Sequence, residues 1–123
     1  MVLWGQTRQR AFDDAREARN GDDDGVALLY YLEMNLGPEA VVGKPGVTND
    51  VIPLVQPDLV SYSSYSSTNA FAKTDNVTAA DAVFMGVLDF VDGKLDGDKT
   101  FPFRDAFTRR VFVGEYGSHA SEA

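Results

Sequence analysis

Three short apolar runs separate the polar parts of the chain, at Val26–Leu32, Leu59-Val60 and Val111–Val113. The first run, Val-Ala-Leu-Leu-Tyr-Tyr-Leu, does not alternate with polar residues. A continuous apolar run is typical of a parallel strand that is covered on both faces, although periodicity alone does not distinguish it from a buried turn of helix. The pattern therefore predicts three strands, the first of them buried on both sides.

Apolar residues at helical spacing predict two longer helices. The first helix spans Thr7–Asn20 and ends at Asn20-Gly21, a common stop signal. The second begins with Thr78 as its N-cap and ends at Asp92-Gly93. Its apolar stripe is the clearest in the chain and consists of Val83, Phe84, Val87, Leu88 and Val91. Both helices have one apolar face that must pack against other elements.

Two shorter segments complete the expected order of elements. A brief helical turn runs from Thr48 to Ile52, limited by Pro53 and Pro57. The hydroxyl-rich stretch Ser61–Ser67 carries two tyrosines, which favours an ordered loop over a flexible linker. The order helix, strand, short helix, strand, helix, strand predicts an α/β fold with parallel strands joined by right-handed connections.

Polar side chains follow each predicted strand. Glu33 and Asn35 come after the first strand, and their spacing of two residues places both on one side if the strand continues. The second strand leads into Tyr62 and Tyr65, and the third into Glu115 and Tyr116. The carboxyl ends of parallel strands meet at one edge of a sheet, where ligands bind in folds of this kind.

This combination of side chains is suited to carbohydrate chemistry. Hydrolysis of a glycosidic bond uses one carboxyl group as proton donor and a second as nucleophile or base. Aromatic rings stack on sugar faces, and amides bind hydroxyl groups. The alternative for each carboxylate is a structural role, such as capping the helix that follows its strand.

Composition excludes several other classes of function. The net charge is −8, whereas nucleic acids and anionic membranes require clustered Lys and Arg. There is no cysteine, and no apolar run approaches the roughly 20 residues of a membrane span. The first residues do not resemble a signal peptide, and the cellular compartment is left open.

No cofactor or metal is expected. The acidic turn Asp22–Asp24 lacks the alternating oxygen ligands of a calcium loop, and Asp96 and Asp98 fit a solvated turn better than a cation site. His119, the only histidine, lies beyond the third strand and is read as incidental. Phosphate loops, serine nucleophile elbows and histidine zinc motifs are absent from the sequence.

Val111–Gly117, reading Val-Phe-Val-Gly-Glu-Tyr-Gly, resembles the seventh strand of the TIM-barrel glycoside hydrolases of the retaining clan A, the cellulase and mannanase relatives. The resemblance implies that Glu115 is the catalytic nucleophile. Asp58–Tyr65 is similar to the sixth strand and its loop, where the clan often places an aromatic residue beside the nucleophile, here Tyr62 or Tyr65. Val26–Asn35 would then be the fifth strand.

The resemblance further implies that residues 1–123 are an incomplete (β/α)8 barrel with about strands five to seven. A full barrel has about 250 residues, so the remainder of the barrel would lie outside this chain. The clan's general acid ends the fourth strand, which is also outside it, and we expect the fragment alone to be inactive. The resemblance assigns no catalytic role to Glu33, which lies on the fifth strand. We expect Glu33 to bind substrate, together with Asn35, Tyr62, Tyr65 and Tyr116.

Two other functions remain open at this point. The first is a non-catalytic carbohydrate-binding barrel that keeps the aromatic residues but lacks the acid. The second is an unrelated open α/β domain in which Glu115 is structural. The second would be favoured if Glu33 and Glu115 lay far beyond the ~5–10 Å that separates cooperating carboxyl groups.

Overall fold

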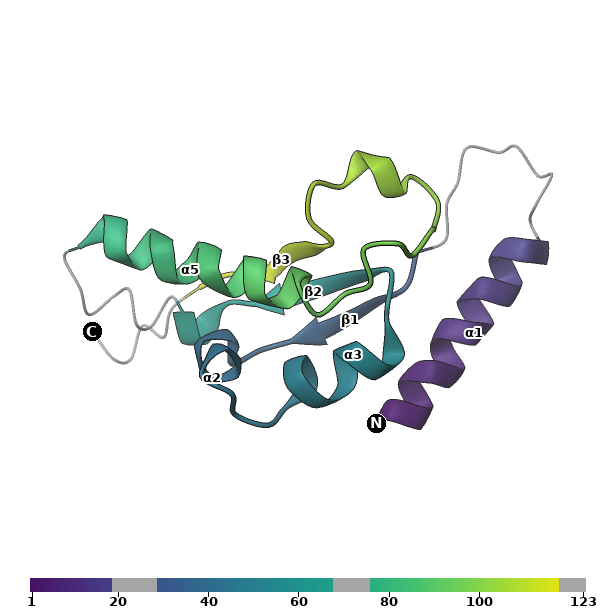
Figure 1. Cartoon of the computed structure of the whole chain (residues 1–123), viewed down its shortest axis with the longest axis horizontal. Helices are drawn as coiled ribbons and strands as arrows, with labels where there is room; N and C mark the ends of the chain where they lie inside the picture. Colours follow the sequence, from purple (N-terminus) through teal and green to yellow (C-terminus); the bar gives the residue numbers. More distant parts are fainter. Residues whose placement is uncertain (19–28, 68–75, 118–123) are drawn as a thin grey trace.

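The computed structural model describes residues 1–18, 29–67 and 76–117. A three-stranded parallel sheet lies at its centre, in the order β1-β2-β3 (Figure 1). The strands are β1 (Tyr31–Met34), β2 (Leu59–Ser63) and β3 (Val111–Glu115). Neighbouring strands in the sheet are therefore also successive in the chain. The predicted α/β class with parallel strands is confirmed.

The helices connect and flank these strands. The two longest are α1 (Val2–Ala18) and α5 (Val77–Asp92). Between β1 and β2 lie α2 (Gly37–Val41), the π-helical segment η1 (Val47–Val51) and α3 (Ile52–Val55), and a 3-10 turn, η2 (Arg104–Ala106), precedes β3. No helix within the described ranges has the length and apolar character that a membrane span needs.

The main core lies between α5 and one face of the sheet. Met34, Val60, Tyr62 and Val111 supply this face from the three strands. They pack against the stripe of α5, of which Val87, Leu88 and Val91 are buried. The predicted apolar stripe is thus confirmed as a core surface at Phe84, Val87, Leu88 and Val91, but not at Val83, which is 47% exposed.

A second, smaller cluster joins α1 to the rest of the molecule. It consists of Tyr30, Val51 and Val55, with Phe12 of α1 packed against it. The rings of Phe12 and Tyr30 lie 5.2 Å apart between centroids. Gly5 of α1 contacts Val55 so closely that an added Cβ would lie 2.8 Å from a methyl carbon of Val55. The contact between α1 and α3 therefore depends on a residue without a side chain.

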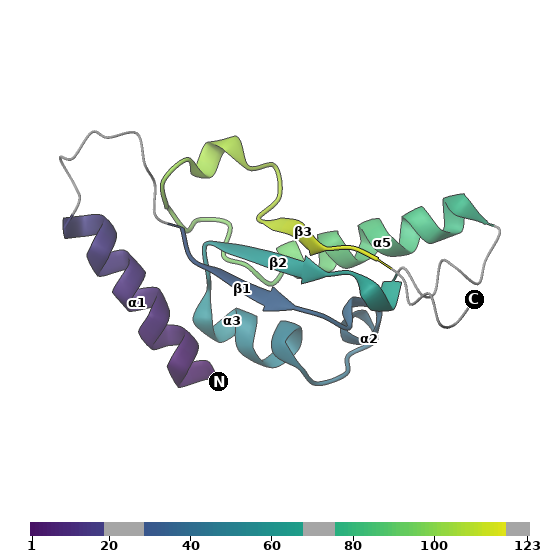
Figure 2. The ribbon, with the colours of Figure 1, turned by 180° about the vertical axis from the view of Figure 1, so that it is seen from behind.

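No helix of the described residues lies over the opposite face of the sheet (Figure 2). We call it the bare face; strand alternation places Tyr31 and Glu33 of β1, Ser61 and Ser63 of β2 and Phe112 of β3 on it. Tyr31 is 54% exposed and Phe112 40% exposed. Their rings meet edge to face with centroids 5.7 Å apart, across the intervening strand β2. The prediction that the first strand is covered on both faces is wrong for the residues described, because every helix that packs on the sheet lies on one side.

Several predicted boundaries also need correction. The first strand is Tyr31–Met34, later than the predicted Val26–Leu32, whose first residues lie outside the described ranges. The first helix starts at Val2, five residues earlier than predicted. Asn76, not Thr78, caps α5, since its side-chain oxygen accepts a hydrogen bond from the backbone N–H of Ala79 at 3.0 Å. Each error concerns an end of an element, where propensity signals are weakest.

Candidate functional site

A β-bulge in β3 determines the face of the sheet on which Glu115 lies. Val113 pairs with Tyr62, but the next pair along the strands is Glu115 with Ser63, so Gly114 is an extra residue in β3. Regular alternation would have placed Glu115 on the same face as Val113, towards α5. The extra residue places it instead on the face of its partner Ser63, which is the bare face.

Gly114 is required at the bulge by its close approach to β2. A Cβ atom added there would lie 1.9 Å from Ser61 Oγ and 3.3 Å from Ser61 Cβ. β3 continues through this glycine to Glu115, two residues beyond the apolar run Val111–Val113. The absence of a side chain at Gly114 permits the irregular pairing that places Glu115 on the bare face.

The backbone of Glu115 is held by Ser64, the first residue after β2. The backbone N–H of Ser64 donates to the Glu115 carbonyl at 3.0 Å, and its hydroxyl donates to the same oxygen at 2.9 Å. Ser64 is fully buried, whereas Glu115 is exposed. The main chain of Glu115 is therefore fixed while its carboxylate is accessible.

Glu33 lies on the same face, two strands away from Glu115. Ser63 Oγ donates a hydrogen bond to Glu33 Oε1 at 2.6 Å. Glu33 pairs with Ser61, and Glu115 pairs with Ser63, which is two residues further along β2. Two strand spacings of about 4.8 Å and an offset of about 6.6 Å place the two Cα atoms roughly 12 Å apart. The carboxylates face the same space with Ser63 between them, and only Glu33 is bound to this serine.

Tyr65 and Tyr116 lie beside Glu115 at the carboxyl edge. The Tyr65 ring packs over Gly117, where an added Cβ would lie 3.0 Å from Tyr65 Cε1. Tyr65 is 39% exposed and Tyr116 is 77% exposed. Both rings are therefore accessible at the carboxyl edge of the sheet.

Tyr62 requires a correction. It is fully buried on the α5 face of the sheet, and its hydroxyl is hydrogen-bonded to Ser67. Its ring packs near Phe84 and against Gly37, where an added Cβ would lie 2.6 Å from the Tyr62 hydroxyl oxygen. A side chain in this place belongs to the core and does not reach a substrate. Of the two tyrosines left open by the sequence, Tyr65 is the one near Glu115.

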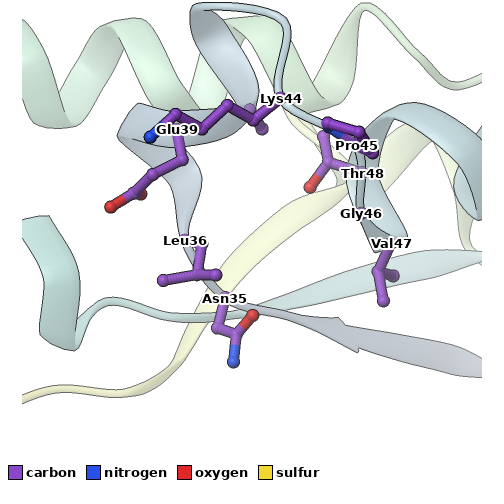
Figure 3. Close-up of a pocket in the computed structure, with 9 residues that line it drawn as sticks. Asn35, Leu36, Glu39, Lys44, Pro45, Gly46, Val47 and Thr48 are labelled. Carbon is purple, nitrogen blue, oxygen red and sulfur yellow. The ribbon is translucent and has the colours of Figure 1, made fainter.

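Asn35 and Glu33 do not share a cavity, so the structure does not bring them to one target. Glu33 lines a cavity of about 380 Å³ beside the outer edge of β1. Asn35 lies beyond the end of β1 and lines a different cavity of about 240 Å³, together with residues of α2 and η1 (Figure 3). The expected pairing depended on a strand that continues to Asn35, whereas β1 ends at Met34.

The cavity at Glu33 also contains residues that the sequence patterns did not reveal. Trp4 and Arg8 of α1 line it, and the Arg8 guanidinium lies 4.5 Å from the centroid of the Trp4 ring. Trp4 is the only tryptophan in the chain and is 58% exposed. Its spacing of four residues from Arg8 on a helix is the signal that could have identified the pair.

Asp58 forms a charge network at the opposite, amino-terminal edge of the sheet. It is fully buried, with Arg16 Nη1 at 2.5 Å, Lys99 Nζ at 3.1 Å and the Tyr30 backbone N–H at 2.8 Å. Burial raises the pKa of Asp58, but the hydrogen bonds from Arg16 and Tyr30 and the charge of Lys99 outweigh it, so the net pKa lies below its usual value. This edge is distant from the carboxyl ends of the strands and its network is structural.

Arg110 is a second buried charge at this edge. It donates from Nε to the Asp58 carbonyl at 2.9 Å and from Nη2 to the Pro57 carbonyl at 2.8 Å. Its guanidinium lies 5.2 Å from the centroid of the Phe101 ring. Burial lowers the pKa of Arg110, with a further contribution from nearby Arg104. The residue fixes the start of β3 to the start of β2.

No cluster of three or more His, Asp or Glu side chains suited to a metal ion occurs among the described residues. Asp22–Asp24 and His119 lie outside them. Asp96 is described, and one of its carboxylate oxygens accepts a hydrogen bond from the Asp98 backbone N–H at 2.9 Å, as in an ordinary turn.

Comparison of the chain with protein families, with curated proteins and with solved structures finds no match. The functional argument therefore depends on the residues at the carboxyl edge.

Proposed function

We propose that this chain is part of a retaining glycoside hydrolase built on a (β/α)8 barrel, with Glu115 as the nucleophile. The observation that carries the proposal is the bulge at Gly114. It places an exposed carboxylate on the bare face, at the carboxyl edge of a parallel sheet, on a backbone fixed by Ser64. A nucleophile needs both an accessible carboxylate and a fixed position.

The arrangement of the sheet supports a barrel over an open doubly wound domain. In a barrel, successive strands are neighbours and the helices lie on the outside only, whereas a doubly wound sheet has helices on both faces and a reversal of strand order. The described strands are in chain order, and the helices that pack on the sheet lie on one face (Figure 2). The bare face would then point into the barrel, where further strands would cover Tyr31 and Phe112.

In this mechanism the Glu115 carboxylate attacks the anomeric carbon as the glycosidic bond breaks, and the leaving group departs as an alcohol after it takes a proton from the general acid. Water then hydrolyses the covalent glycosyl intermediate and releases Glu115. The proton donor would come from the fourth strand of the barrel. Glu33 lies on the strand that corresponds to the fifth of the barrel, not the fourth, and its bond to Ser63 suits a residue that accepts hydrogen bonds from sugar hydroxyls. Tyr65 and Tyr116 would supply aromatic surface for the sugar ring.

Substitution of Glu115 by Gln in the protein that carries the complete barrel tests this proposal. Hydrolysis should fall by several orders of magnitude with little change in stability, because an exposed carboxylate is replaced by an amide of the same shape. Glu17→Gln, which alters an exposed carboxylate of α1, is the matched control and should leave turnover unchanged. Glu33→Gln should raise KM more than it lowers kcat.

Near-normal turnover of Glu115→Gln would overturn the catalytic assignment. If the unmodified protein binds oligosaccharides but hydrolyses none, the non-catalytic carbohydrate-binding barrel becomes the better account, since Tyr65, Tyr116 and Glu33 would still contact the sugar.

A further inference from the structure

Two neighbouring serines contact the two carboxylate residues of the candidate site. Ser63 is the last residue of the central strand β2, and Ser64 directly follows it. Ser63 is bonded to Glu33 on one neighbouring strand, and Ser64 is bonded to Glu115 on the other. The hydroxyl-rich stretch Ser61–Ser67 therefore contributes to the site in a way that its composition did not indicate.

Ser63 acts on the side chain of Glu33. Its hydroxyl donates to Glu33 Oε1 at 2.6 Å, and Ser63 is only 6% exposed. A hydrogen bond to a carboxylate is stronger than one between neutral groups, and a nearly buried donor has little competition from water. The bond therefore restricts the orientation of a carboxylate on a residue that is otherwise exposed.

Ser64 acts on the main chain of Glu115. Both donors of Ser64, its backbone N–H and its hydroxyl, bind the same Glu115 carbonyl oxygen. This carbonyl belongs to the planar peptide group that follows Glu115, so the two bonds fix the orientation of that group beside the Cα atom that carries the carboxylate. Gly114 and Gly117 lie on either side of Glu115, and glycine permits many backbone conformations. The bonds from Ser64 therefore restrain a segment that its own residues leave adaptable.

We propose that Ser63 and Ser64 are positioning residues, Ser63 for Glu33 and Ser64 for Glu115. The roles of the two carboxylates rest on the proposed function. Because the two serines are consecutive, they hold the Glu33 side chain and the Glu115 main chain in a fixed relation. Ser63 acts on substrate binding through Glu33, which accepts hydrogen bonds from sugar hydroxyls. Ser64 acts on the chemical step, because Glu115 must approach the anomeric carbon in one orientation.

The two serines predict different kinetic effects in the protein with the complete barrel. Ser63→Ala should raise KM by at least about threefold and change kcat by less than about twofold. Ser64→Ala should lower kcat by at least about tenfold and change KM by less than about twofold, because a misplaced nucleophile slows a step that follows binding. Each variant is the matched control for the other, since both remove one hydroxyl from a buried serine. A general loss of stability would not separate kcat from KM in this way.

Nuclear magnetic resonance of the full chain tests both contacts without a substrate. After correction for intrinsic rates, the backbone N–H of residue 64 should exchange at least about tenfold faster in Ser64→Ala than in the unmodified chain. The carbon-13 signal of the Glu33 carboxyl group should move in Ser63→Ala and stay in place in Ser64→Ala. The control is the backbone N–H of Val60, which donates to the Arg110 carbonyl near the start of β2 and should exchange equally in all these proteins.

The separate roles are overturned if both variants lower kcat alike or raise KM alike. Unchanged exchange at residue 64 in Ser64→Ala, or an unmoved Glu33 signal in Ser63→Ala, would overturn the corresponding positioning role even in an active hydrolase. If the unmodified protein hydrolyses no glycoside but both signals change as expected, the proposed function fails and the positioning of the two carboxylates stands.

Discussion

At the scale of single residues, Gly114 and Ser61 determine the direction of Glu115. The pattern Val-Phe-Val-Gly-Glu gives no sign of a bulge, because alternation is counted along one strand and a bulge is a property of two. The sequence therefore predicted Glu115 at the carboxyl edge but did not predict the face on which it lies. The same limit applies to Tyr62 and Tyr65, whose different burial follows from where β2 ends.

Gly114→Ala tests the bulge. The new methyl group would clash with Ser61 Oγ, so we expect a loss of about 1–3 kcal/mol in the free energy of unfolding. Ser61→Ala in the same chain should recover part of this loss, because it removes the nearest atom. Denaturant unfolding of both variants measures the effect.

Gly86→Ala on α5 is the control for this experiment. Nothing lies within 4 Å of an added Cβ there, and alanine favours a helix by about 1 kcal/mol over glycine. It should therefore stabilise the protein. Equal stability of Gly114→Ala and the unmodified protein would contradict the proposed close contact.

At the scale of elements, a buried ion pair links α1 to the sheet, and no sequence pattern predicted it. Arg16 lies on the polar side of a predicted helix and Asp58 precedes a predicted strand, and they are 42 residues apart. Only the tertiary fold brings them together. Periodicity did identify the two long helices and most of the apolar stripe of α5, because each depends on short-range repetition.

Asp58→Asn should destabilise the protein by about 3–5 kcal/mol, since it leaves Arg16 and Lys99 without their buried counter-charge. The lowered pKa of Asp58 stabilises the fold at pH values above its unfolded pKa of about 3.9 and ceases to do so as pH falls through the folded pKa. Stability should therefore decrease below about pH 4, and less steeply in Asp58→Asn.

Urea unfolding at neutral and acidic pH measures both effects. Asp14→Asn, an exposed position on α1, is the matched control and should change stability by no more than about 0.5 kcal/mol. An unchanged stability of Asp58→Asn at neutral pH would show that the network does not hold α1 to the sheet.

At the scale of the whole molecule, the sheet has two open edges and one bare face among the described residues. The exposed rings of Tyr31 and Phe112 and the accessible carboxylate of Glu115 lie on that face or at its carboxyl end. Further strands that close a barrel would bury the rings and leave the carboxylate at the mouth. The proposed function therefore accounts both for the exposed aromatic rings on the bare face and for the position of the candidate nucleophile.

The most direct test of this account is covalent trapping of the intermediate. The protein with the complete barrel would be treated with activated dinitrophenyl fluoroglycosides of glucose, mannose and xylose, and the labelled peptide would be mapped by mass spectrometry. The account predicts that one of these sugars becomes attached to Glu115. Attachment to another residue, or hydrolysis of the matching glycoside without any label on Glu115, would contradict it.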